Sequence, residues 1–314
     1  MAQYNNAVLT LTKTATPDPY VTFAHDKFFL VSFPSQPQPS FAPVARKLNF
    51  AQTFTAGDRI EICFPEQRKK DVAWRPPPDT DHSADLWAPE LHALQGRWYV
   101  YFAACHPRHG NRSHRMYVLG GPSAAQDPTQ GRWEFLGPIR GMDMRQWAID
   151  GTVMHLQGEI YFIYSGWPLE KLDDVSELIQ QLYIFRMADP VTAASPPVRI
   201  CKPEERWEFT ADHGINEGPH WTKEYKMNTL RFLDGDPLNP SSWQKGTKPL
   251  MKNGPHNDGP WGPGHGSFMH IGNEIVGIYH ATDGPGDGWE NRKARMQRVV
   301  LGRKVRGWVR ALDR

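Results

Sequence analysis

The chain repeats one pattern of polar and hydrophobic positions. A turn containing Gly or a polar pair precedes four or five strand-forming residues rich in aromatics. The pattern appears as FFLV from Phe28, WYVYF from Trp98, IYFIY from Ile160 and EIVGIYH from Glu274. Short runs of aromatic and β-branched residues bounded by turn residues are typical of buried strands. The pattern therefore predicts copies of one strand unit.

The spacing of these copies predicts the architecture. They begin 70 residues apart (28 to 98), then 62 (98 to 160), then 114 (160 to 274). The last interval is close to twice the others, so we expect a further copy near residue 217, which makes five units. A repeat of roughly 50 to 60 residues built from short strands is typical of a propeller with four-stranded blades. We predict an all-β, five-bladed β-propeller forming one domain over residues 1–314.

A second marker supports this register. A strand, an Asp-Pro pair and then a Trp recur together, at Asp127-Pro128 with Trp133, Asp189-Pro190 with Trp207, and Asp236-Pro237 with Trp243. Asp-Pro opens turns, and Trp packs well across strands.

Two stretches depart from the repeat. Glu90 to Asp127 spans 37 residues and Asp150 to Asp189 spans 39, whereas Glu217 to Asp236 spans only 19. Blade four is therefore expected to be short by roughly two or three strands. Conversely, residues 33–52 contain a Pro/Ser/Gln-rich segment, PSQPQPSFAPV, that predicts a disordered or anomalous insert.

One hypothesis covers both departures: the gene model retained an intron near residues 31–52 and skipped coding sequence near residues 224–229. A complete transcript that agrees with this sequence at both places would refute it.

Composition narrows the class of partner. The net charge is +2 and the basic residues are scattered, so neither nucleic acid nor a membrane surface is an expected partner. The three cysteines, Cys63, Cys105 and Cys201, lack metal-binding spacing and are expected to be buried thiols. Aromatic residues make up 12% of the chain, which is typical of carbohydrate sites and equally of a large β core.

The N-terminal residues lack the basic and apolar segments of an export signal, and no apolar run is long enough to span a bilayer. As written, the sequence predicts a soluble chain without a signal peptide. An extracellular parent whose N-terminus was trimmed or misassigned would give the same pattern.

Four carboxylates recur at the blade period. Asp18, Glu90, Asp150 and Glu217 each stand ahead of a strand unit or its turn. Taken singly, each is as readily a turn or edge residue. Their recurrence favours convergence on one central site, because inner strands of a propeller start near its axis. Two carboxyl groups suffice to hydrolyse a glycosidic bond, and a third nearby raises the pKa of the acid by like-charge repulsion.

At this point the residues resemble a known family. The motifs DPYVTFAHDKFFLV, WAPELHALQGRWYVYFAA, AIDGTVMHLQGEIYFIYSG, INEGP and GPGHGSF resemble, in order and spacing, those of glycoside hydrolase family 43. This family comprises five-bladed propeller arabinanases, α-L-arabinofuranosidases and β-xylosidases. The resemblance runs from about Asp18 to Arg298. WAPELH and GWENRKAR are most similar to the exo-acting arabinofuranosidase branch.

The resemblance implies roles for the carboxylates. Asp18 would be the general base that activates water, Glu217 the general acid, and Asp150 the residue that tunes and orients Glu217. The family inverts anomeric configuration. Glu90 lies outside its catalytic set and is expected to be structural.

The resemblance also implies supporting residues. His265 would lie near the bottom of the pocket and help to hold a central cation, often Ca²⁺, largely through water. Read without the family, a His between glycines is usually a hydrogen-bonded loop residue. Arg295, or alternatively Arg292, would bind sugar hydroxyls. Trp87 and Trp147 are candidate sugar-stacking walls, with core packing the equal alternative.

We therefore expect an inverting glycosidase that releases L-arabinofuranose from arabinan or arabino-oligosaccharides. No cofactor is required, Ca²⁺ in the central channel being optional. Its expected partners are plant cell-wall polysaccharides, arabinan and arabinoxylan, and it is expected to be a monomer. The alternatives are a β-xylosidase of the same family, an inactive carbohydrate-binding propeller in which the short blade four disables Glu217, and a propeller interaction scaffold.

Overall fold

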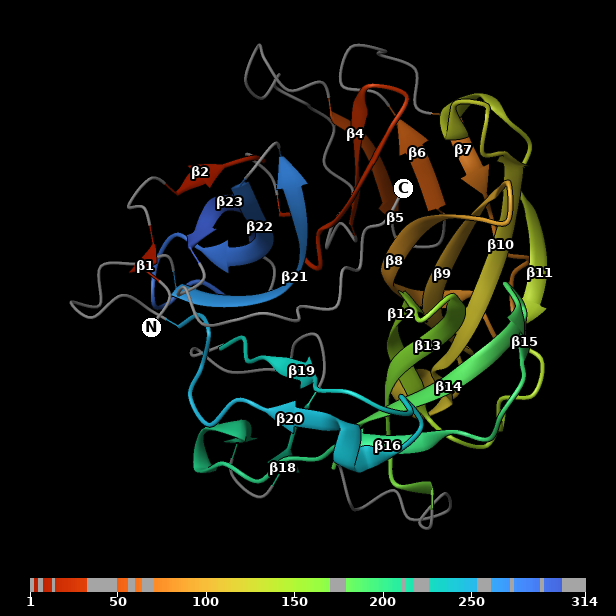
Figure 1. The fold of residues 1–314 in the computed structure, drawn as a ribbon. Coiled ribbons are helices and arrows are strands. Elements are labelled where there is room, and N and C mark those ends of the chain that lie inside the picture. Colours follow the sequence, from red (N-terminus) through yellow and green to blue (C-terminus); the bar gives the residue numbers. More distant parts are fainter. Residues whose placement is uncertain are drawn as a thin grey trace.

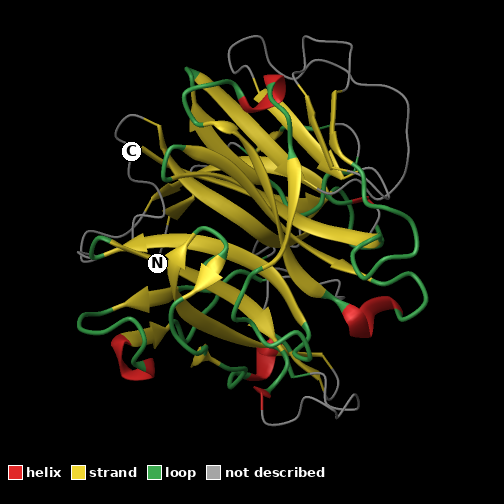
Figure 2. Cartoon of the chain, turned by 90° about the vertical axis from the view of Figure 1, so that its right-hand side faces the viewer, coloured by secondary structure: helices red, strands yellow, loops and turns green. Residues whose placement is uncertain are grey.

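The fold is built from β-strands arranged as blades around a centre (Figure 1). The computed structural model describes residues 3–4, 8–12, 15–32, 50–55, 60–63, 71–169, 179–210, 213–216, 226–252, 261–271, 274–288 and 291–300. In this part of the chain the helical segments are short 3-10 turns at the periphery (Figure 2). They are η1 (Gly110–Ser113), η2 (Pro128–Gln130), η4 (Arg206–Glu208) and η5 (Pro240–Ser242). The prediction of an all-β propeller is confirmed.

The first three blades are full sheets. Blade one has the strand order β3 (Tyr20–Ala24), β4 (Lys27–Ser32), β5 (Phe50–Thr55), β6 (Ile60–Cys63) and β7 (Asp71–Trp74). Blade two contains β8 (Ala84–Leu94), β9 (Arg97–Cys105), β10 (Arg115–Ser123) and β11 (Glu134–Pro138). Blade three contains β12 (Ala148–Leu156), β13 (Glu159–Gly166), β14 (Gln181–Asp189), β15 (Thr192–Ala193) and β16 (Val198–Cys201).

Blade four is described only in part, so its predicted shortness stays a prediction. Between blades three and five, the described residues form only two-stranded sheets, β17 (Phe209–Thr210) with β18 (His213–Gly214), and β19 (Leu230–Phe232) with β20 (Trp243–Lys245). The strand copy expected near residue 217 lies outside the described residues.

Blade five contains both ends of the described chain. Its strands are β21 (Trp261–Ile271), β22 (Glu274–Thr282), β23 (Lys293–Val300) and the N-terminal strands β1 (Gln3–Tyr4) and β2 (Leu9–Thr10).

The predicted strand units are the second strands of their blades. β4, β9, β13 and β22 each form an antiparallel hairpin with the strand before them. Two of the Asp-Pro markers form tight turns: Asp127 caps the 3-10 segment η2, and Asn239 N–H donates to the Asp236 carbonyl at 2.9 Å. The following Trp bonds back to each turn: Trp133 Nε1 donates to the Pro128 carbonyl at 3.0 Å, and Trp243 Nε1 to that of Pro237 at 2.9 Å. The repeat therefore reflects a local hydrogen-bonding unit.

The predicted insert over residues 33–52 falls mostly outside the described residues. Its last three residues, 50–52, begin β5, which pairs in parallel with β4 through Phe28 and Phe50. Parallel neighbours need a connection longer than a hairpin turn, and β4 and β5 are far enough apart in the sequence to allow one.

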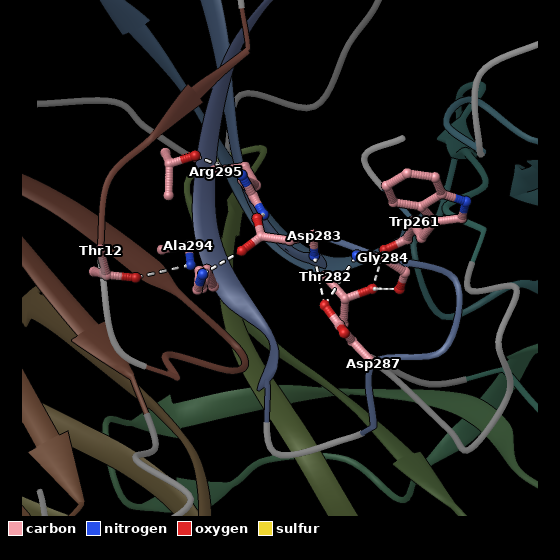
Figure 3. A network of polar contacts seen from close by, with 10 residues as sticks. Thr12, Trp261, Thr282, Asp283, Gly284, Asp287, Ala294 and Arg295 are labelled. Carbon is pink, nitrogen blue, oxygen red and sulfur yellow. Dashed lines mark hydrogen bonds and ion pairs between the residues drawn. The ribbon is translucent and has the colours of Figure 1, made fainter. Parts of the chain in front are cut away.

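The N-terminal segment closes the ring on blade five. β1 and β2 both pair with β23, with Leu9 opposite Met296. Thr12 Oγ1 accepts a hydrogen bond from the Ala294 main chain at 3.1 Å, and Arg295 bonds both Thr10 and Asp283 (Figure 3). The outermost pairing on β23 therefore comes from the N-terminal end of the described chain.

The hydrophobic core is divided between the blades. The largest cluster joins blades two and three and includes Tyr101, Phe162, Tyr164 and Phe185. Cys105 and Cys201 are buried free thiols, as predicted. Among the described residues, no helix has the length and apolarity to cross a membrane.

Candidate active site

Three residues near the starts of the inner strands share an unusual backbone conformation. Asp18, just before β3, has φ 51°, Asp150 in β12 has φ 53° and His265 in β21 has φ 24°. Positive φ is uncommon for residues other than Gly and often marks functional positions. The strand register shifts between Ile149 and Thr152 and around Gly264 to Gly266, so Asp150 and His265 sit on β-bulges, which re-aim side chains.

A glycine follows two of these residues because there is no room for a side chain. A Cβ on Gly151 would lie 2.2 Å from the Phe162 ring, and one on Gly266 would lie 2.1 Å from the Ile278 carbonyl oxygen. The Asp-Gly and His-Gly pairs thus let each bulge press against the second strand of its own blade.

The three side chains converge. Nδ1 of His265 lies 3.7 Å from Oδ1 of Asp18 and 3.7 Å from Oδ2 of Asp150. The two carboxylate oxygens can therefore be no farther apart than the sum of these distances. Both carboxylates are largely buried, with 7% of each side chain exposed. Blades one, three and five thus meet at one site, as the sequence predicted for Asp18 and Asp150.

Asp18 is held in its ionised form. Its Oδ1 lies 3.3 Å from Nη1 of Arg292 and 3.2 Å from Nδ1 of His280. Burial by itself raises the pKa of Asp18, but Arg292, His265 and His280 together outweigh it and hold that pKa well below its usual range. An ionised carboxylate has free oxygen lone pairs and can therefore accept a proton.

His280 is uncharged at neutral pH. It is fully buried in β22, and burial, followed by the neighbouring Arg292 charge, lowers the pKa of its imidazole to about 3. Asp18 opposes this shift without cancelling it. The ring therefore supports the site as a neutral group.

The main chain just before Glu217 is hydrogen-bonded to β13, the strand that pairs with the strand of Asp150. Asn216 accepts a hydrogen bond from Ser165 Oγ at 3.1 Å and donates its main-chain N–H to Gln180 at 3.0 Å. Ser165 in turn pairs with Ile149, the residue before Asp150. Glu217 itself lies outside the described residues.

The two candidate stacking tryptophans have different environments. Trp87 is half-buried and stacks on the His114 ring at a centroid distance of 3.9 Å. Trp147 is only 2% exposed and stacks on Trp167, while its Nε1 donates to the Asn111 carbonyl at 2.7 Å. Its burial assigns Trp147 to the core, and only Trp87 remains a candidate wall.

Glu90 lies inside the fold and is paired. Its Oε2 lies 2.8 Å from Nε2 of His92, and Nδ1 of that ring faces the Tyr20 hydroxyl at 3.4 Å. In the inner strand of blade two, Asp85 and Ala88 share the left-handed conformation of Asp18 and Asp150, at φ 45° and 41°. Glu90 itself does not have this conformation.

The arginine at Asp18 is Arg292, which is 2% exposed. Arg295, the first choice from sequence, pairs instead with Asp283 and Thr10 in the ring closure. His280 was not singled out by the sequence at all, because one His inside an apolar strand carries no periodic signal.

Part of the site suits a cation held through water. Nδ1 of His265 is buried without a hydrogen-bond partner and faces two carboxylates. Among the described residues, no three His, Cys, Asp or Glu side chains are grouped closely enough to ligate a metal directly. Since Ca²⁺ prefers oxygen ligands, these residues fit a hydrated ion and do not form a direct protein cage.

Buried carboxyl groups that converge at one end of a propeller form the kind of site that glycosidases use, in which paired carboxyl groups flank a glycosidic bond. The model of glycosyl hydrolases family 43 matches residues 65–233, more than half of the chain. The chain belongs to this family, which places it among the glycosidases.

Curated relatives are arabinofuranosidases. The chain is 29% identical over 231 residues to the extracellular exo-alpha-(1->5)-L-arabinofuranosidase of Streptomyces chartreusis, covering 68% of this chain and 67% of that one. It is 31% identical over 244 residues to the enzyme of the same name from Streptomyces avermitilis, covering 69% and 48%. It thus spans about half the length of the latter.

Solved structures share the whole fold. An alpha-L-arabinofuranosidase from Lactobacillus brevis superposes with a TM-score of 0.72 at 25% identity, covering 94% of both chains. A thermostable family-43 glycoside hydrolase gives 0.65 at 18% identity, covering 99% of this chain and 98% of that one.

Proposed function

We propose that this protein is an inverting glycoside hydrolase that releases L-arabinofuranose from arabinan or arabino-oligosaccharides. The observation that carries the proposal is the convergence of Asp18 and Asp150 on one nitrogen of His265, with Asp18 held ionised by Arg292. The sugar is chosen because the curated relatives bear the name arabinofuranosidase.

In the proposed reaction, Asp18 accepts a proton from a water molecule as that water attacks the anomeric carbon. Glu217 donates its proton to the departing glycosidic oxygen, so the acid and base exchange states and the sugar leaves with inverted configuration. Asp150 keeps Glu217 protonated by like-charge repulsion until the bond breaks. An inverting reaction requires the base and the acid to stand about 6.5 to 9.5 Å apart, which leaves room for the water.

The remaining residues bind and orient the sugar. Trp87 is the proposed apolar wall, and Arg292 is the proposed partner of a sugar hydroxyl, because its guanidinium already lies 3.3 Å from Asp18. A hydrated Ca²⁺ held through water by His265 is also proposed. Its charge would favour the ionised forms of the neighbouring carboxylates.

The test is hydrolysis of an aryl α-L-arabinofuranoside and an aryl β-D-xyloside, followed by proton NMR of the first sugar anomer released. We expect arabinose in the inverted configuration, and a preference for the xyloside would indicate the β-xylosidase instead. Asp18→Ala and Glu217→Ala should each abolish turnover while circular dichroism stays native. Retained activity in either variant, or a retained configuration, would refute the mechanism.

One observation favours a second candidate, a carbohydrate-binding propeller without catalysis. In the part of the chain that the structure describes, the strands between blades three and five are at most three residues long. A catalytic acid needs a supporting shell to hold its position. Arabino-oligosaccharide binding by calorimetry without release of product would select this candidate.

A further inference from the structure

His280 reaches the catalytic centre from the second strand of blade five. Its neighbours across the sheet are Gly264 in β21 and Ala294 in β23. At that level the inner strand carries no side chain, because its residue there is Gly264. The ring is fully buried, so its contacts with Asp18 are made away from solvent.

One ring nitrogen serves two groups of Asp18. Nδ1 of His280 lies 3.2 Å from the main-chain nitrogen of Asp18 and 3.2 Å from its Oδ1. A neutral imidazole nitrogen either accepts or donates a hydrogen bond. In one tautomer Nδ1 therefore accepts from the main-chain N–H, and in the other it donates to the carboxylate. Either way, His280 restrains a residue whose left-handed backbone needs support.

The charges around this contact fit a base. Asp18 faces Arg292, His265 and His280, and through His265 it also faces Asp150. Arg292 Nη1 lies 3.5 Å from both ring nitrogens of His280, and a positive charge at that distance disfavours protonation of the ring. Of Arg292 and His280, Arg292 therefore carries a full positive charge beside Asp18, and His280 is neutral. A second full charge would weaken the carboxylate as a base.

We propose that His280 is a positioning residue that fixes the main chain and the carboxylate of Asp18 for its role as the base. This rests on the proposed function, and it adds to it the residue that sets the geometry of Asp18. Both contacts are made by Nδ1. A variant that keeps a polar atom at this place can therefore distinguish a positioning role from a packing role.

The test compares His280→Asn with His280→Gln. The Asn amide occupies roughly the place of Nδ1, whereas the Gln amide occupies roughly that of Nε2 and is closer to His in volume. Positioning predicts that Asn preserves the contact with Asp18 and Gln loses it. A packing role predicts the reverse, because the smaller Asn leaves a cavity.

Two readouts are measured. In His280→Gln, kcat on an aryl arabinofuranoside should fall about 10- to 100-fold with KM within about threefold, as expected for a misplaced catalytic group. The acidic limb of kcat/KM should move to higher pH, because a lost hydrogen bond raises the pKa of Asp18. His280→Asn should stay closer to the wild type in both. Carboxyl ¹³C NMR without substrate, with the Asp18 signal assigned by means of Asp18→Asn, should show the same order: the pKa of Asp18 rises more in His280→Gln than in His280→Asn.

Tyr279→Phe is the matched control. Tyr279 is the adjacent residue in β22, is 1% exposed, and donates its hydroxyl to Gln297 at 2.8 Å. Its loss should lower stability but leave kcat and the pKa of Asp18 unchanged. If His280→Asn is no better than His280→Gln, or if both match the control, the positioning role is refuted. If the wild type hydrolyses no glycoside but the NMR order holds, the proposed function fails and the positioning of Asp18 stands.

Discussion

Asp18 and Asp150 face each other across a single imidazole nitrogen, each with a carboxylate oxygen 3.7 Å from Nδ1 of His265. The three residues come from three different blades, and each has a positive φ. This arrangement favours different roles for the two carboxylates, because Asp18 also faces the Arg292 cation.

The role of Asp150 can be tested by its charge. Asp150→Asn removes a negative charge that, in the proposed mechanism, raises the pKa of Glu217. We expect kcat to fall by about 10²- to 10⁴-fold and the alkaline limb of kcat/KM to move to lower pH. Steady-state kinetics across pH measures both, and an unmoved alkaline limb would contradict the tuning role.

Asp18 should contribute stability that depends on pH. Its native pKa lies below the value of about 3.9 for an unfolded Asp, so the ionised form stabilises the fold above that pH. The contribution is lost as the pH falls through the native pKa. Asp18→Asn should therefore cost about 1–3 kcal/mol at pH 7, and the difference should narrow below about pH 4. Urea unfolding at several pH values measures this, and a constant difference would argue against the ionised state.

Ring closure should depend on the N-terminal segment. Leu11 is 4% exposed and packs with Val21 and Ile278 in the blade-five core. Leu11→Ala should lower the free energy of unfolding by about 2–5 kcal/mol, through lost burial and the cavity left behind. Leu233→Ala, at a residue 45% exposed, is the control and should change little. Equal losses in the two variants would show that closure does not rely on this contact.

The two tryptophans should separate into binding and folding roles. Trp87→Ala should raise KM for arabino-oligosaccharides with a modest change in melting temperature. Trp147→Ala should instead cost about 3–5 kcal/mol of stability, because a large buried side chain is removed. Steady-state kinetics and thermal unfolding of both variants measure these effects. A Trp147→Ala variant that is stable but binds substrate poorly would show that Trp147 has the binding role.

Calcium should act through His265. If the ion binds near its Nδ1, added Ca²⁺ should raise the melting temperature of the chelator-treated protein, since a ligand that binds the native state stabilises it. His265→Ala should abolish this rise, and calorimetric titration with Ca²⁺ should lose its heat. An equal rise in both proteins would place the ion elsewhere.

Much of the fold could be predicted from the sequence because the hairpins of a propeller blade join residues that are close together in the sequence. The hairpins that begin with β3, β8, β12 and β21 each join neighbouring segments through a two-residue turn or a short connection, so aromatic runs and turn residues reveal them directly. The prediction that blade four is short came from counting residues between markers.

What the sequence by itself determined was the strand unit, its period and the recurrence of carboxylates at that period. Only the tertiary structure decided which side chains meet: Arg292 and His280 join Asp18 from the far end of the chain, Arg295 goes to the ring closure, and Trp147 goes to the core. The physical reason is that these contacts join opposite ends of the chain or different blades. A period-two pattern states which face of a strand is buried but not which distant residue it meets.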